Sequence, residues 1–275
     1  MISLLPVFLK IAVSAGMVLS ITMVAERASA RFAGVLMGFP LGAGLSLFFI
    51  GLEQGPVFAA DSALWCIPGL LAILGFAWGY LEGIKRLEKK SAWGIVVCVV
   101  LGLSGFFIMA FSVRYFLPEN IWIRSLVVAI ILLGCIVRFS TISVHKIQGR
   151  IPLTPLLIGS RAGFAATVVL LITGAAEMIG PQWSGIFSIF PTTVLPTVVV
   201  LHHHYGSMAV KGLFREFPLG LLAIMVFALT VSLSYPSFGI YTGTFISYVA
   251  ASAYLFLYEM KLRSMITARL YSARS

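Results

Sequence analysis

Two Phe-Pro pairs interrupt apolar stretches that are otherwise long enough to cross a membrane, and small and hydroxyl-bearing residues surround each pair. Proline has no N–H and its ring clashes with the preceding turn, so each pair leaves backbone carbonyls without their helical partners. Freed carbonyls, half-helix ends and hydroxyls can bind an ion or a polar solute without placing a full charge in lipid. The candidate solute-binding residues are therefore Pro40, Gly42, Gly44, Ser46, Pro191, Thr192, Thr193 and Thr197.

A purely structural interpretation of the same residues stays open. The hydroxyls can cap the broken turns, and glycines spaced four apart can form a helix-packing face. Many transmembrane helices are kinked by proline with no solute bound.

Four charged residues form a second candidate group. Lys10 and Arg161 lie inside apolar stretches, whereas Glu26 and Glu177 close them. Cations inside a span usually face a cavity or a partner. We therefore expect two ion pairs that close alternately as gates, Lys10 with Glu177 and Arg161 with Glu26. The alternative is that both cations extend to the membrane surface while Glu26 pairs locally.

The elements that must position these residues are membrane-spanning helices. Hydrophobic residues make up 60% of the 275-residue chain and charged residues 10%, and mean hydropathy is +1.05. These values lie far outside those of soluble globular proteins. Nine apolar stretches are each about long enough to cross a hydrocarbon core of roughly 30 Å. They lie near residues 3 to 24, 31 to 52, 63 to 80, 94 to 113, 121 to 138, 154 to 175, 183 to 203, 217 to 235 and 238 to 258.

The distribution of basic residues predicts the orientation. Fifteen of the nineteen Lys and Arg residues lie on the side reached after the odd-numbered spans, whereas only Arg114 and Arg124 lie on the other side. Cytoplasmic loops carry the excess of positive charge, so we expect the N-terminus outside and the C-terminus in the cytoplasm. The net charge of +10 is explained in this way without nucleic acid.

The chain repeats itself at an offset of 151 residues. The segment LSITMVAE at 19 to 26 aligns with LLITGAAE at 170 to 177, both Phe-Pro pairs align, and GLLAI at 69 to 73 aligns with GLLAI at 220 to 224. Equivalent spans are five crossings apart, so the second unit enters from the opposite face. We therefore expect a 4+1+4 inverted-topology repeat, an architecture common among secondary transporters. Its parts are a first four-helix repeat (1 to 115), a linking helix and cytoplasmic loop (116 to 150), and a second repeat with a basic tail (151 to 275).

Other chemistries have weaker support. The segment GLSG at 102 to 105 resembles a rhomboid nucleophile motif, but no histidine in a span is placed to serve Ser104 as a base. His202, His203 and His204 are consecutive, and consecutive helical side chains point about 100° apart, so an interfacial helix end is favoured over a metal site. The three cysteines have no metal-ligand spacing. We expect neither an enzyme, a metal nor a cofactor.

The stretch AGVLMGFPLGAGLSLFFIGLEQG at 33 to 55, after a helix with an acidic end, resembles the GlpM-like small bacterial inner-membrane proteins. The resemblance covers residues 10 to 80 and 161 to 230. It implies a tandem fusion of two such units and a multi-pass protein of the bacterial plasma membrane, and it implies no substrate.

The expected function is secondary transport of a small polar or anionic solute, or of an anionic lipid head group, by alternating access. The Phe-Pro breaks would form its midplane site. The alternative is a non-transporting membrane subunit that organises an envelope-synthesis complex. The expected partners are the lipid bilayer, the solute, and either a second copy of the chain or a component of that complex, with no nucleic acid.

Overall fold

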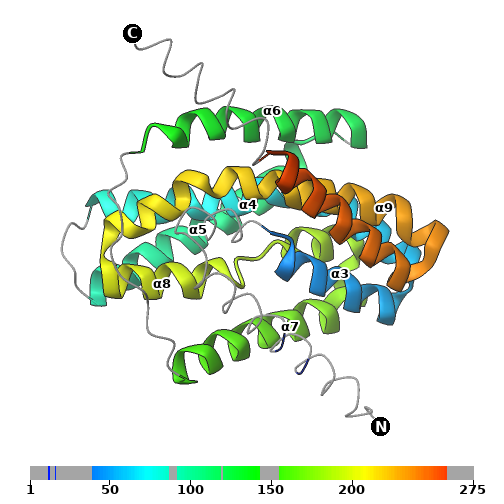
Figure 1. The fold of residues 1–275 in the computed structure, drawn as a ribbon, viewed down its shortest axis with the longest axis horizontal. Coiled ribbons are helices and arrows are strands. Elements are labelled where there is room, and N and C mark those ends of the chain that lie inside the picture. Colours follow the sequence, from blue (N-terminus) through cyan, green and yellow to red (C-terminus); the bar gives the residue numbers. More distant parts are fainter. Residues whose placement is uncertain are drawn as a thin grey trace.

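A computed structural model describes residues 39–86, 92–118, 120–142 and 155–258, and also the single residues 12 and 16. The side chains of residues 155–158, 160 and 161 are not described. The described chain contains seven helices (Figure 1). They are α3 (Leu41–Gln54), α4 (Pro56–Arg86), α5 (Ala92–Phe116), α6 (Ile121–Ser140), α7 (Pro155–Ser188), α8 (Val194–Tyr205) and α9 (Ser207–Leu257). The all-helical prediction is confirmed for this part of the chain.

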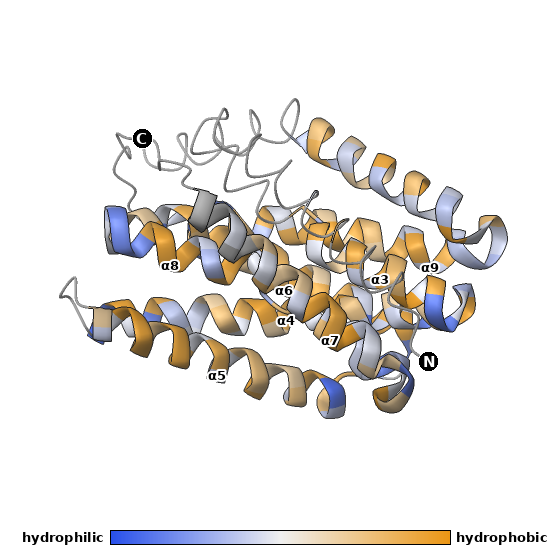
Figure 2. Cartoon of the chain, turned by 90° about the horizontal axis from the view of Figure 1, so that it is seen from below, coloured by the Kyte–Doolittle hydropathy of each residue, from blue (hydrophilic) through white to orange (hydrophobic). Residues whose placement is uncertain are grey.

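Five of these helices, α4, α5, α6, α7 and α9, are long and apolar enough to cross a membrane. The outward faces of α5 and α6 carry large apolar side chains such as Ile108, which is 68% exposed, and Leu126, which is 61% exposed. Hydrophilic colouring gathers instead at the ends of α3, α5 and α8 (Figure 2). An apolar flank with polar ends is what a multi-pass membrane protein presents to lipid.

Helix α4 lies at the centre of the bundle and packs against α5, α7 and α9. Its contact with α5 depends on glycine: a Cβ added at Gly75 would lie 2.5 Å from the carbonyl oxygen of Gly105, and one at Gly79 would collide with the carbonyl of Leu101. Apolar side chains gain little from leaving lipid, so close approach of small residues supplies the van der Waals contact that holds such helices together.

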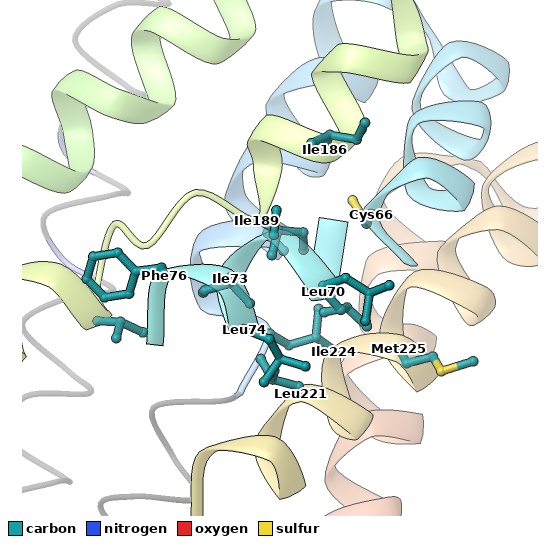
Figure 3. Close-up of a cluster of buried hydrophobic side chains, with 14 of the residues drawn as sticks. Cys66, Leu70, Ile73, Leu74, Phe76, Ile186, Ile189, Leu221, Ile224 and Met225 are labelled. Atoms are coloured by element: carbon teal, nitrogen blue, oxygen red, sulfur yellow. The ribbon is translucent and has the colours of Figure 1, made fainter. Parts of the chain in front are cut away.

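The opposite side of α4 packs into an apolar cluster (Figure 3). Leu70 and Leu74 of α4 meet Ile189 from the end of α7 and Leu221 and Ile224 from α9, and all five are buried. The second Phe-Pro pair follows Ile189 directly, so this cluster holds the second break against the centre of the bundle.

Two of the helices contain a sharp turn at glycine. Gly180 in α7 has φ 73° and ψ 171°, and Gly239 in α9 has φ 74° and ψ 177°, a backbone region that is essentially restricted to glycine. The expected spans 154 to 175 and 183 to 203 meet at the first turn, and the spans 217 to 235 and 238 to 258 meet at the second. Most of the first two expected spans lies outside the described residues, so the count of nine stays a prediction.

Candidate functional site

The first Phe-Pro break is a tight turn directly before α3. Pro40 has φ −74° and ψ 54°, and the N–H of Leu41 donates to the carbonyl of Phe39 at 2.7 Å. These values describe an inverse γ-turn, in which proline suits the central position because its ring sets φ. The carbonyl of Pro40 then accepts the N–H of Gly44 at 2.9 Å, which starts the helix.

The second break has the same hydrogen bonds. The N–H of Thr192 donates to the carbonyl of Phe190 at 2.6 Å, and the N–H of Leu195 donates to the carbonyl of Pro191 at 2.9 Å. Helix α7 ends at Ser188 and α8 begins at Val194, so the expected span 183 to 203 is a discontinuous helix. The break predicted from proline is therefore a true interruption and not only a kink.

The two breaks touch each other. A Cβ added at Gly42, in the first turn of α3, would lie 2.5 Å from Oγ1 and 3.8 Å from Cβ of Thr192, which is itself buried. Only glycine leaves room for the threonine side chain at this point. Two segments about 150 residues apart in the sequence thus meet through the residues that were predicted to bind solute.

Tyr248, in the last part of α9, completes the first break. Its hydroxyl donates to the carbonyl of Pro40 at 3.3 Å, and its ring lies 5.8 Å from that of Phe39 and 4.8 Å from that of Phe227. A Cβ at Gly44 would collide with the same hydroxyl. Tyr248 was missed in the sequence because the aligned position, Val97, carries no polar group, and only the fold brings it to the turn.

The remaining predicted hydroxyls differ in their use. Ser46 is 1% exposed, and its Oγ has no hydrogen-bond partner in the described structure. Thr197 donates to the carbonyl of Thr193 at 2.7 Å inside α8, and Thr193 makes no side-chain capping bond. Ser46 is therefore a fully buried hydroxyl near the breaks with an unused donor, and it lies one helical turn beyond Gly42 on the same face of α3.

The predicted gates fall largely outside the described residues. Lys10 and Glu26 are not described, and Arg161 belongs to α7 without a described side chain. Glu177 lies on the exposed face of α7. Both ion pairs stay predictions.

The histidines at the end of α8 point in different directions. His202 is buried, and its Nδ1 lies 3.1 Å from the hydroxyl of Tyr80, whereas His203 and His204 are exposed. Within the part of the chain that the structure describes, no three His, Cys, Asp or Glu side chains gather as a metal site would require. Ser104 is exposed on α5.

Comparison with known proteins returns no match: no family model, no curated protein and no solved structure matches the chain. The resemblance to the GlpM-like proteins stays a prediction.

Proposed function

We propose that the chain is a secondary-type transporter of the bacterial plasma membrane, which binds a small polar or anionic solute, or an anionic lipid head group, between its two Phe-Pro turns. The observation that carries the proposal is the contact of Gly42 with Thr192, because it joins the start of α3 to the break between α7 and α8. Sites of this kind, where discontinuous helices meet, are typical of secondary transporters. The proposed architecture is nine spans in a 4+1+4 inverted repeat, with the N-terminus outside.

Equivalent backbone hydrogen bonds support the repeat. Besides the bonds at the two turns, the N–H of Gly55 donates to Gly51 at 2.9 Å, and the N–H of Gly206, 151 residues later, donates to His202 at 3.0 Å. Both glycines have positive φ, 91° and 79°, and each separates a short helix from a long one. The two sites have the same kind of turn and the same hydrogen bond, and they are separated by the offset of 151 residues found in the sequence. This agreement favours two copies of one unit.

Ring contacts follow the same relation. Phe39 of the first break packs on Tyr248 in the last part of α9, and Phe190 of the second break packs on Phe106 of α5, with ring centres 5.8 and 5.3 Å apart. In a repeat with an offset of 151 residues, α5 corresponds to the last part of α9. Each break thus packs on the fourth helix of the other unit, as a two-fold relation between units requires.

The chemistry at the breaks favours a solute with hydrogen-bond acceptors. Helices α3 and α8 both begin at the breaks, so their first N–H groups and the positive ends of their dipoles lie in the same region. Ser46 supplies an unused hydroxyl on α3. Donors without a full charge suit an anion or a polar group that must be released again.

Access of water to Ser46 separates transport from a static role. In a variant that retains no native cysteine, Ser46→Cys places a thiol at a buried site with little change in volume. An impermeant, charged methanethiosulfonate reagent is added to oriented vesicles from each side in turn. Alternating access predicts slow labelling of residue 46 from both sides, because each state opens the breaks to one side.

The matched control is Ser247→Cys. Ser247 is also buried, but its hydroxyl donates to the carbonyl of Gly243 at 2.7 Å and lies 3.5 Å from the hydroxyl of Ser234, both within α9. It should stay unlabelled from both sides. If residue 46 is as unreactive as residue 247, the breaks are closed packing features, and the non-transporting envelope subunit becomes the better interpretation.

A further inference from the structure

Two arginines gather on one tryptophan, away from the Phe-Pro turns. The guanidinium carbon of Arg124 lies 4.1 Å from the ring centre of Trp65, and that of Arg114 lies 5.2 Å from the same centre. The two guanidinium carbons are therefore no more than about 9 Å apart, where like charges repel unless water or an anion separates them. Arg114 lies in the last turn of α5 and Arg124 near the start of α6, at the end of the two helices that carries few basic residues.

Neither arginine forms an ion pair with an acid among the residues that the structure describes. The described ion pairs join Glu82 to two cations at the end of α4 and Glu216 to its neighbour, and none involves Arg114 or Arg124. Asp61 lies one helical turn before Trp65, is exposed, and makes no ion pair in the described structure. The charge of the arginine pair is thus not compensated by any described carboxylate.

Arg124 is the more unusual of the two. Its side chain is only 4% exposed, and its Nε has no hydrogen-bond partner in the described structure; the Oγ of Ser125 beside it is also buried and unpartnered. A ring contact satisfies the face of a guanidinium but not its N–H edge, which carries the donors. A buried charge with an unused donor is costly, so a missing acceptor is the simplest explanation.

The surroundings place this acceptor at the level of a lipid head group. Tyr115 and Trp122, which flank the α5–α6 connection, are each 70% exposed, and such aromatic residues gather at membrane–water interfaces. Guanidinium forks match the oxygens of phosphate closely, and a tetrahedral phosphate has enough oxygens to accept from two forks at once.

We propose that Arg114 and Arg124 form a binding site for a phosphate group at the Trp65 end of α4. The phosphate belongs either to a free anion or to a phospholipid head group, two sources that offer the same oxygens. The site is separate from the Phe-Pro turns, and its test does not depend on transport.

The test measures the thermal midpoint of the full chain in lipid nanodiscs. One arm titrates inorganic phosphate at constant ionic strength in phosphatidylcholine discs, and the other replaces part of the phosphatidylcholine with phosphatidylglycerol. The variants are Arg114→Gln, which is half-buried at a helix end and should fold, and Arg124→Gln. Arg138→Gln is the matched control, because Arg138 is an exposed arginine at the far end of α6.

A free anion is supported if phosphate raises the thermal midpoint of the wild type and if Arg114→Gln needs about tenfold more phosphate for the same rise. Arg138→Gln should need the same amount of phosphate as the wild type. A rise only with phosphatidylglycerol, with the same dependence on the variants, supports a lipid phosphate. Equal responses in wild type and Arg114→Gln, or no response in either arm, would overturn the proposal.

Glu119 needs its own variant, because it lies between the two arginines in the chain and outside the described residues. If the carboxylate of Glu119 itself binds the two arginines, phosphate should leave the thermal midpoint of the wild type unchanged and should raise that of Glu119→Gln. That result would also overturn the proposal. If the site exists, Glu119→Gln should leave the response of wild type unchanged or strengthen it.

Discussion

Replacing Gly42 with alanine tests the contact between the two breaks. The new Cβ would lie 2.5 Å from Oγ1 of Thr192, roughly 1 Å closer than the ~3.5 Å at which non-bonded atoms are comfortable. Thr192 is buried and β-branched, so its side chain has few other rotamers to occupy. The two helix starts must therefore separate, or the threonine must leave its preferred rotamer.

The expected cost follows from these distances. Overpacking of a tight interior costs about 1–3 kcal/mol, and replacement of a helical glycine by alanine returns about 0.5–1 kcal/mol, so Gly42→Ala should lower the free energy of unfolding by up to about 2.5 kcal/mol. Thr192→Ala removes Oγ1 and leaves only a Cβ at 3.8 Å, which is ordinary contact. The free energy of unfolding of the double variant should therefore be about 1–2 kcal/mol higher than the value expected from adding the two single effects.

The assay is reversible unfolding in mixed micelles, followed by tryptophan fluorescence, for the wild type, both single variants and the double variant. Two controls make it specific. Thr192→Val keeps a γ-carbon in place of Oγ1 and should not rescue Gly42→Ala. Gly134→Ala, where nothing lies within 4 Å of the added Cβ, should stabilise the protein slightly. A coupling near zero between residues 42 and 192 would refute the contact, and with it the shared site.

Three further predictions concern the turns and the topology. Tyr248→Phe removes the hydroxyl that donates to the first break and should cost about 0.5–1.5 kcal/mol of unfolding free energy in the same assay. Gly55→Ala and Gly206→Ala should each cost about 1–3 kcal/mol, because both glycines hold positive φ with an extended ψ that alanine rarely adopts. Single cysteines at Arg86 and Phe116 should be labelled by impermeant maleimide from opposite sides, with residue 86 in the cytoplasm.

Each of these predictions has an opposing result. The loss in Tyr248→Phe should exceed that in Tyr241→Phe, since Tyr241 is 71% exposed; equal losses would mean that the bond to Pro40 contributes nothing. If Gly55→Ala or Gly206→Ala leaves the free energy of unfolding unchanged, the turn at that residue tolerates another backbone conformation. Labelling of residues 86 and 116 from the same side would exclude the inverted repeat.

Patterns along the chain sufficed to predict local structure. Long apolar stretches predict helices, because backbone groups in lipid must bond within their own segment, and the described chain is helical accordingly. Pro191 predicted the interruption between α7 and α8, and Pro40 predicted the turn at which α3 begins, since a missing N–H acts wherever the residue stands. The turns at Gly180 and Gly239 have non-helical backbone angles and lie where one expected span ends and the next begins, so these span ends also agree with the sequence.

Long-range contacts could not be predicted in this way. The sequence offered Gly42 and Thr192 as separate candidates, but their contact depends on how α3 and α8 pack. Tyr248 and the arginines around Trp65 had no repeated partner or motif to mark them. The sequence by itself determined where the chain is helical and where it breaks, because those effects act over one or two turns. Only the tertiary structure decided which breaks, hydroxyls and charges meet, because close approach in a membrane depends on small residues matching across helices that are far apart in the chain.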